Sequence, residues 1–147
     1  MRQLLFGEKF NELNFNTKFY KLTNELETHN GFKYTDGLNI DTIPFNASGS
    51  CSSGGLYFTE YDKISLWLNY GGQLMYYIRE VIIPPDAQVY IEKNKFKADK
   101  LYLKPRKLIG EFDGWHDYDF CLEAVKKNGY ALEYVKEQTE EICLAAV

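Results

Sequence analysis

The sequence has no uninterrupted apolar run near the roughly 20 residues that a membrane-spanning helix requires. Its longest apolar stretch, residues 74–85, is broken by Arg79 and Glu80. The N-terminal residues turn polar too soon to form the apolar region of a secretory signal. We therefore expect a cytoplasmic protein that is neither exported nor embedded in a membrane.

Cysteine and histidine are also scarce. The chain has three cysteines, Cys51, Cys121 and Cys143, and two histidines, His29 and His116. An odd number of cysteines without a framework spacing fits a reducing compartment. No CxxC pair occurs, and neither histidine has a ligand-like spacing to a cysteine, so we expect no metal site. No motif predicts a bound cofactor.

Apolar and aromatic side chains are plentiful, at 45% and 16% of the 147 residues. A chain of this size and composition can bury a core without support from metals or disulfides. Strand-like patterns recur over residues 18–23, 56–59, 74–83, 88–92, 100–104 and 107–112. The run 74–83 is apolar on both faces, which predicts a central strand.

Turn signals and one amphipathic segment complete the expected N-terminal fold. The tripeptide TDG at 35–37 separates residues 32–34 from 38–40 and predicts a hairpin. Residues 43–55 form a Ser/Gly-rich loop, and residues 60–69 predict a helix with one apolar face. Many strands with few helices predict an α+β fold, a mainly antiparallel sheet with one or two helices.

The composition changes after residue 112. Residues 113–147 contain no proline, and the hexapeptide FCLEAV at 120–125 recurs as ICLAAV at 142–147, an offset of 22 residues. Self-similarity at a fixed offset is typical of helical repeats. We therefore predict an α+β domain over residues 1–112, followed by a helical repeat segment over 113–147. Whether such an array continues past Val147 stays open.

Charge is distributed unevenly along the chain. The net charge is −4, and the acidic residues outnumber the basic ones after residue 110. Residues 93–107 are instead strongly basic and include Lys95, Lys97, Lys100 and Lys104. Such a stretch could contact the phosphates of a nucleic acid or another anion. The alternative is a strand face that is simply solvated.

Several stretches resemble a known group of proteins. Residues 19–23 (FYKLT), 30–34 (NGFKY), 37–41 (GLNID), 54–59 (GGLYFT) and 77–81 (YIREV) resemble a domain that precedes repeats in mimivirus-type giant-virus proteins, including their ankyrin proteins. Residues 120–147 resemble the short two-helix repeats of unknown function in the same viruses. The resemblance implies a protein of the infected-cell cytoplasm whose repeats present a binding surface.

A second resemblance concerns chemistry. Residues 79–85 (REVIIPP) look like the strand of mono-ADP-ribosyltransferases that carries the catalytic glutamate. The resemblance implies that Glu80 stabilises an oxocarbenium-like centre and that Tyr57 or Thr59 faces the nicotinamide of NAD. Ile78 and Lys21 stand where that family has other residues. The alternative is that Arg79 and Glu80 are polar residues on an otherwise apolar strand.

Three functional hypotheses follow. The first is a non-catalytic protein-interaction or targeting module of a viral repeat protein, whose partner is a protein. The second is an NAD-binding domain like an ADP-ribosyltransferase, active or degenerate, so the enzyme question stays open. The third is a nucleic-acid binder that uses residues 93–107.

Overall fold

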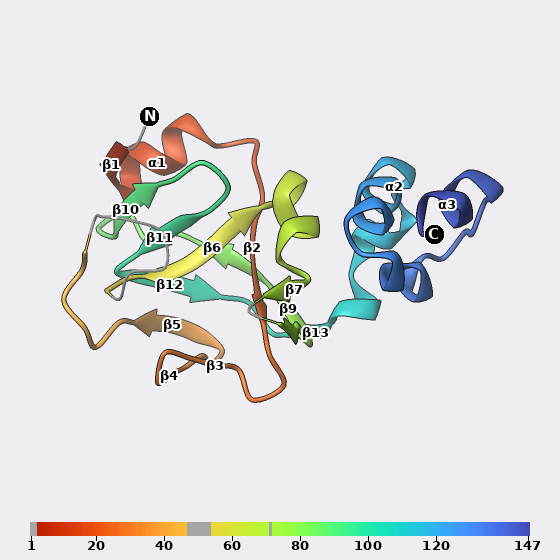
Figure 1. Ribbon diagram of the computed structural model, residues 1–147. Coiled ribbons are helices and arrows are strands. Elements are labelled where there is room, and N and C mark those ends of the chain that lie inside the picture. The colour runs from red at the N-terminus through yellow and green to blue at the C-terminus, as the bar shows by residue number, and fades with distance from the viewer. Residues whose placement is uncertain (1–2, 47–53, 71) are drawn as a thin grey trace.

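A computed structural model describes residues 3–46, 54–70 and 72–147. Within these ranges nine strands form one antiparallel sheet in the order β1-β10-β11-β6-β2-β9-β12-β5, and β13 also pairs with β9 (Figure 1). The strands are Gln3–Phe6 (β1), Phe19–Thr23 (β2), Gly37–Ile40 (β5), Leu56–Glu60 (β6), Tyr77–Ile82 (β9), Gln88–Ile91 (β10), Phe96–Ala98 (β11), Lys100–Leu103 (β12) and Lys107–Leu108 (β13).

Two small strand pairs and short helical segments complete the chain. The pairs are Thr28–His29 (β3) with Phe32–Lys33 (β4), and Asn69–Tyr70 (β7) with Gln73–Leu74 (β8). The α-helices are Gly7–Leu13 (α1), Tyr118–Lys127 (α2) and Glu140–Ala145 (α3). The 3-10 helices are Tyr61–Trp67 (η1), Ile109–Glu111 (η2), Asp113–His116 (η3) and Gly129–Tyr134 (η4).

The central strand predicted from the apolar run is confirmed as β9. It lies between β2 and β12 and pairs with both in antiparallel register. Ile78 and Val81 are buried on its two faces. A strand covered on both faces needs apolar side chains at successive positions, and this need explains the continuous run in the sequence.

The hairpin predicted around residues 35–37 is wrong. β4 pairs with β3, whereas β5 pairs with β12, so the two runs do not pair with each other. The buried Asn39 explains the difference: its amide donates to the Thr35 and Gly37 carbonyls, and its Oδ1 accepts from the Thr35 N–H. The side chain closes the turn and leaves both strands to other partners.

Two further local predictions concern the helix over residues 60–69 and the loop over residues 43–55. The helix expected over residues 60–69 is the 3-10 helix η1, which buries Ile64 and Ser65. The Ser/Gly-rich loop expected over residues 43–55 lies partly outside the described residues.

The predicted fold class is wrong at the C-terminus. The sheet agrees with a mainly antiparallel α+β fold, but residues 113–147 are not a helical repeat segment. The first hexapeptide lies within the ten-residue helix α2 and contains its four buried residues, whereas the second begins in the six-residue α3, extends past its end, and has only Ile142 buried. Stacked repeats bury equivalent positions, and these two do not.

The C-terminal elements instead pack on the sheet. They lie together on one side of it (Figure 1), and hydrogen bonds hold them to η1. The Tyr61 hydroxyl donates to Asp117 Oδ2 at 2.8 Å, and the Asn128 amide donates to the Ser65 carbonyl at 3.2 Å. Trp115, 1% exposed, shares a core with Tyr20 and Ile78 of the sheet. The apolar side chains of the C-terminal elements therefore face the sheet.

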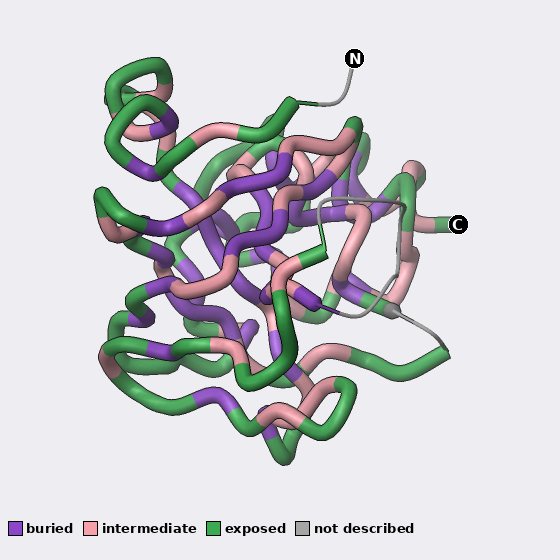
Figure 2. The backbone as a smooth tube through the Cα atoms, turned by 90° about the vertical axis from the view of Figure 1, so that its left-hand side faces the viewer, coloured by how far each residue is buried: buried purple, intermediate pink, exposed green. Residues whose placement is uncertain are grey.

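The remaining core lies among the strands. Phe10, Phe19, Phe58 and Phe96 form a group of rings in edge and stacked contacts, with centroids 5.0–6.0 Å apart. Buried residues run through the middle of the molecule, and exposed residues lie over its outer turns (Figure 2). Of the residues in the described ranges, none belongs to a helix long and apolar enough to cross a membrane.

Candidate functional site

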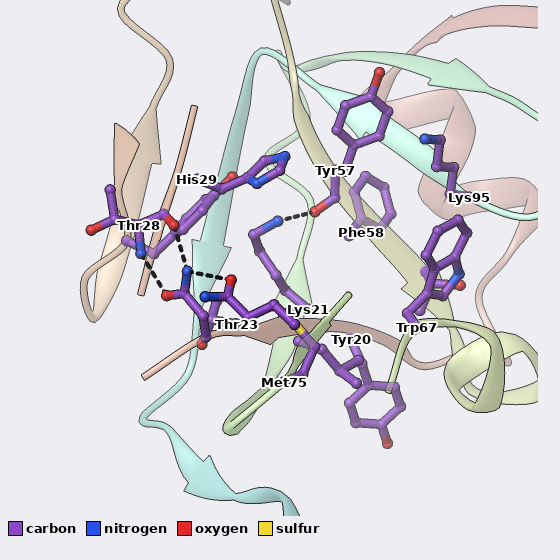
Figure 3. A pocket seen from close by; sticks show the side chains of 15 residues that line it. Tyr20, Lys21, Thr23, Thr28, His29, Tyr57, Phe58, Trp67, Met75 and Lys95 are labelled. Atoms are coloured by element: carbon purple, nitrogen blue, oxygen red, sulfur yellow. Dashed lines mark hydrogen bonds between the residues drawn. The ribbon is translucent and has the colours of Figure 1, made fainter. Parts of the chain in front are cut away.

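A pocket with a cavity volume of about 100 Å³ opens beside strands β2 and β6. Lys21 and Tyr57 come from these strands, Trp67 from η1 and His29 from β3. Lys95 enters from the turn between β10 and β11. Figure 3 shows Lys21 between His29 on one side and the group of Lys95, Trp67 and Tyr57 on the other. Aromatic rings form much of the wall, the ionisable side chains other than tyrosine are basic, and the neutral polar residues are Thr23, Asn24, Thr28, Thr59 and Gln73.

Lys21 is the most enclosed cation of the pocket. Its side chain is 6% exposed, its Nζ donates to the Tyr57 carbonyl at 2.6 Å, and it lies 4.3 Å from the centroid of the Tyr34 ring. No carboxylate of the described residues forms an ion pair with it. Burial, aided by the charge of Lys95, lowers the pKa of Lys21 to about 7.

Lys95 and Lys97 lie around the ring of Tyr57. The Lys95 Nζ is 4.2 Å from the Tyr57 centroid and 5.4 Å from the Trp67 centroid. The Lys97 Nζ is 5.6 Å from the same Tyr57 ring. Cation–π contacts of this kind favour a cation near a ring face where water is scarce. Both lysines are at least nine-tenths buried.

The pocket contains basic side chains and, among the described residues, no acidic one. Burial lowers the pKa of His29, and the charges of Lys21 and Lys95 lower it further. No aspartate or glutamate is among the described residues that line the pocket, and the residues outside the described ranges include none. The arrangement thus suits an anionic group better than a cation.

The residues implied by the ADP-ribosyltransferase resemblance do not meet. Tyr57 lines the pocket, whereas Glu80 lines a separate, wider hollow together with Tyr20, Tyr61 and Asp113. The Glu80 carboxylate is 3.3 Å from the Lys104 Nζ. The catalytic roles of Glu80 and Tyr57 therefore stay predictions, because the structure does not bring the two side chains into one pocket.

The basic stretch of the sequence is split in space. Lys95 and Lys97 point inward, whereas Lys100 and Lys104 lie on the exposed side of the sheet and pair with Asp86 at 2.9 Å and with Glu80. The four lysines do not form one surface, although a nucleic-acid interface of this kind needs a continuous basic stripe.

Sequence reasoning missed most of the pocket. Lys21 attracted attention only as a departure from another family's pattern, and His29 and Trp67 were not selected. One signal was present: Lys21 interrupts a strand of buried residues, Phe19, Tyr20 and Thr23. A lysine at such a position is rarely buried without a functional or structural reason.

Metal binding finds no support in the arrangement. Within the ranges that the structure describes, no group of three His, Cys, Asp or Glu side chains is placed to hold a metal ion.

A second feature lies on the outer face of the sheet. Tyr102 of β12 lies directly opposite Leu38 of the edge strand β5 and Ile82 of β9, and Ile40 follows two residues after Leu38. These four side chains are 45–55% exposed, whereas Leu101 and Leu103 on the other face are fully buried. We call Leu38, Ile40, Ile82 and Tyr102 the edge patch.

The chain is similar to several proteins of Acanthamoeba polyphaga mimivirus. It is 37% identical to an uncharacterised protein over 103 residues, which cover 66% of this chain and 72% of that protein. A candidate ankyrin repeat protein is 30% identical over 136 residues, or 80% of this chain and 39% of the relative. Another is 44% identical over 70 residues, 46% of this chain and 33% of the relative.

The chain thus spans well under half of these ankyrin-type relatives. No family model matches the chain, and no solved structure matches it. The resemblance to giant-virus proteins, including ankyrin proteins, is confirmed by these relatives. These relatives do not test the predicted boundary after residue 112, which stays a prediction, whereas the short repeats predicted beyond it are contradicted by the structure.

Proposed function

The chain belongs to a family of giant-virus proteins that includes the uncharacterised mimivirus relative, and we propose that it is a protein-interaction module that binds a protein partner through the edge patch. The observation that carries this proposal is the row of exposed apolar side chains at Leu38, Tyr102 and Ile82 across three neighbouring strands. The names of the ankyrin-type relatives agree with this role, because ankyrin repeats are stacked units whose extended surface binds partners.

The edge patch departs from what a solvated sheet face requires. An antiparallel sheet with one face in water usually alternates buried apolar residues with exposed polar ones. In β12 the buried residues are Leu101 and Leu103, but the outward residue between them is the aromatic Tyr102. Contiguous apolar side chains that remain in water mark contact surfaces.

The surroundings of the edge patch are polar. Lys100 lies opposite Ile40 and pairs with Asp86, and Lys104 pairs with Glu80. An apolar centre with a rim of charged residues is the usual anatomy of a protein–protein interface. The partner that fits is a protein with a complementary apolar patch. Tyr102 would be the anchor of this interface on this chain's side, because tyrosine is enriched among residues that dominate binding energy.

Site-specific crosslinking tests the proposal. A photo-reactive benzoylphenylalanine replaces Tyr102 in one variant and Leu144 in a control, because Leu144 is 67% exposed and lies in α3, at the opposite end of the molecule from β5 (Figure 1). The protein crosslinked through position 102 is identified, purified and titrated with the wild-type chain. Crosslinks that are equal at the two positions would contradict a role for the edge patch.

The titration then uses matched substitutions. The double variant Leu38→Ser/Tyr102→Ser is expected to weaken binding at least about tenfold, because removing one interface anchor costs on the order of 2 kcal/mol. The Leu144→Ser variant is expected to bind as the wild type does. Unchanged binding by the double variant, with its fold intact by circular dichroism, would reject the proposed surface.

The other two hypotheses have less support. Glu80 and Tyr57 lie in different hollows, and the four lysines of the basic stretch do not share a surface. Nicotinamide release from NAD that is lost in Glu80→Gln would reinstate the enzyme hypothesis. Salt-steep binding of nucleic acid, reduced by reversing the charge of Lys100 and Lys104, would reinstate the third.

A further inference from the structure

The pocket beside β2 and β6 holds a buried basic group that has no acidic partner among the described residues. An ammonium group has three donors, and the buried Lys21 uses one, toward the Tyr57 carbonyl. The ion pairs among the described residues do not include Lys21, and the undescribed residues contain no acid that could supply one. Enclosing such a charge without a counter-charge is unfavourable.

Two other basic side chains converge on the same space. Lys95 reaches the pocket from the β10–β11 turn, and His29 lines it from β3. Burial is the main cause of the lowered pKa values of Lys21 and His29, and repulsion from Lys95 contributes in both cases. Like charges gathered inside a pocket are typical of a site that receives the opposite charge.

Aromatic and apolar side chains line much of the remaining surface, beside neutral threonine, asparagine and glutamine residues. Tyr57 and Trp67 lie on the same side of the pocket as Lys95, and Met75 lies below Lys21 (Figure 3). Binding sites for small molecules combine such apolar walls with a few convergent polar groups. The cavity volume of about 100 Å³ limits the enclosed part of a ligand to a small group.

We propose that this pocket binds a small organic oxyanion, a carboxylate or a phosphate monoester, whose charged group lies between Lys21 and Lys95 and whose flat apolar part lies against Trp67. This pocket is distinct from the edge patch. The proposed ligand would therefore bind in addition to the protein partner, at a separate site. The carboxylate and phosphate classes share the same chemistry here: oxygen acceptors for lysine ammonium groups, which form strong charge-assisted hydrogen bonds.

Isothermal calorimetry with three probes of similar shape tests the charge requirement. Benzoate and phenyl phosphate carry the two oxyanions, and benzamide is the neutral counterpart of benzoate. Binding of at least one oxyanion in the millimolar range or tighter, at least about tenfold tighter than benzamide, is expected from a charge-assisted hydrogen bond. The tighter oxyanion identifies the ligand class. Equal binding of benzamide, or no binding of either oxyanion, would overturn the proposal.

Two variants test the role of Lys21. Lys21→Met keeps an unbranched side chain, one atom shorter, and removes its charge, and it is expected to lose at least about tenfold in oxyanion affinity. Lys136→Met, at an exposed position of the C-terminal segment, is the matched control and is expected to bind like the wild type. Thermal unfolding of each variant verifies that it folds. A folded Lys21→Met variant with undiminished affinity would contradict the assignment.

Proton uptake provides a readout that loss of structure would not mimic. An anion beside Lys21 favours its charged form, so binding at pH 8 is expected to take up protons. Comparing the binding enthalpy in two buffers of different ionisation enthalpy measures this uptake. Lys95, His29, Tyr34 and Tyr57 also face the site, so Lys21→Met serves as the reference, and its uptake is expected to be smaller. Equal uptake by the two proteins would contradict the role of Lys21.

Discussion

Arg79 and Glu27 form a buried two-pronged ion pair between strand β9 and the loop after β2. Arg79 Nε lies 2.8 Å from Glu27 Oε2, and Arg79 Nη2 lies 2.8 Å from Glu27 Oε1. Both side chains are about 3% exposed. Thr23 and Arg106 donate to the same carboxylate. Glu27 adopts a positive φ of 52°, so the pair holds a strained loop against the sheet.

The Glu27 carboxylate accepts hydrogen bonds from three side chains, and these bonds lower its pKa. Burial by itself raises the pKa of Glu27, but the hydrogen bonds from Arg79, Thr23 and Arg106 outweigh it and leave the pKa below its ordinary value. Arg79, which the sequence presents as one of two polar residues on an apolar strand, is therefore a structural residue of this fold.

Removing one partner of this pair is expected to destabilise the protein strongly. Arg79→Met leaves the Glu27 carboxylate buried with fewer donors, which typically costs about 3–5 kcal/mol. Asp36→Asn is the control, because Asp36 also contacts Arg79 but its side chain is 68% exposed, and an exposed pair contributes about 0–1 kcal/mol. Urea unfolding followed by tryptophan fluorescence measures both changes. Equal losses in the two variants would show that burial of Glu27 does not govern the cost.

Lys21 is expected to make stability rise with pH. Its pKa is about 7 in the folded protein against 10.5 for an ordinary lysine, so between these values the unfolded chain binds more protons. The penalty is fully present below about pH 7 and disappears as the pH rises toward 10.5. The expected slope is about 1.4 kcal/mol for each pH unit within that window.

Urea unfolding of the wild type and of Lys21→Met at pH 7 and pH 9 isolates this contribution. Between the two pH values, the wild type is expected to gain about 2–3 kcal/mol relative to the variant. Lys95, His29, Tyr34 and Tyr57 face Lys21 in both proteins, so their own titration largely cancels in the comparison. A constant difference between the two proteins would show that Lys21 is charged at both pH values in the folded state.

The two cysteines of the recurring hexapeptide are expected to differ in reactivity. Cys121 is 2% exposed and its Sγ contacts the Trp115 carbonyl at 3.2 Å, whereas Cys143 is partly exposed. Burial raises the pKa of the Cys121 thiol, and the charge of Asp117 raises it further. Both effects lower the concentration of reactive thiolate at Cys121.

Labelling with Ellman's reagent in a Cys51→Ser background tests this difference. The Cys121→Ser variant, which retains Cys143, is expected to react at a rate near that of an accessible thiol. The Cys143→Ser variant, which retains Cys121, is expected to react only as fast as the protein opens. Similar rates in the two variants would mean that the positions are equivalent, as a true repeat requires.

Local patterns predicted the sheet well. Strand-like segments at 18–23, 56–59 and 88–92 became β2, β6 and β10, since alternation and β-branched or aromatic residues depend only on nearby sequence. The hairpin at 35–37 failed because Asn39 closes the turn with its side chain. The helical repeat failed because similar hexapeptides meet different surroundings: one packs against the sheet, and the other leaves most of its residues partly exposed.

By itself the sequence determined an antiparallel sheet with β9 at its centre, kinship with giant-virus proteins, and a dense run of lysines in one stretch. Only the tertiary structure decided which of those lysines point inward and which lie on the outer face. The register of β11 against β6 sets Lys97 opposite Tyr57 and turns Lys95 toward the pocket, while the register of β12 leaves Lys100 on the outer face. Spacing along one strand fixes alternation, but which face becomes interior depends on the partner strands, which lie far away in the sequence.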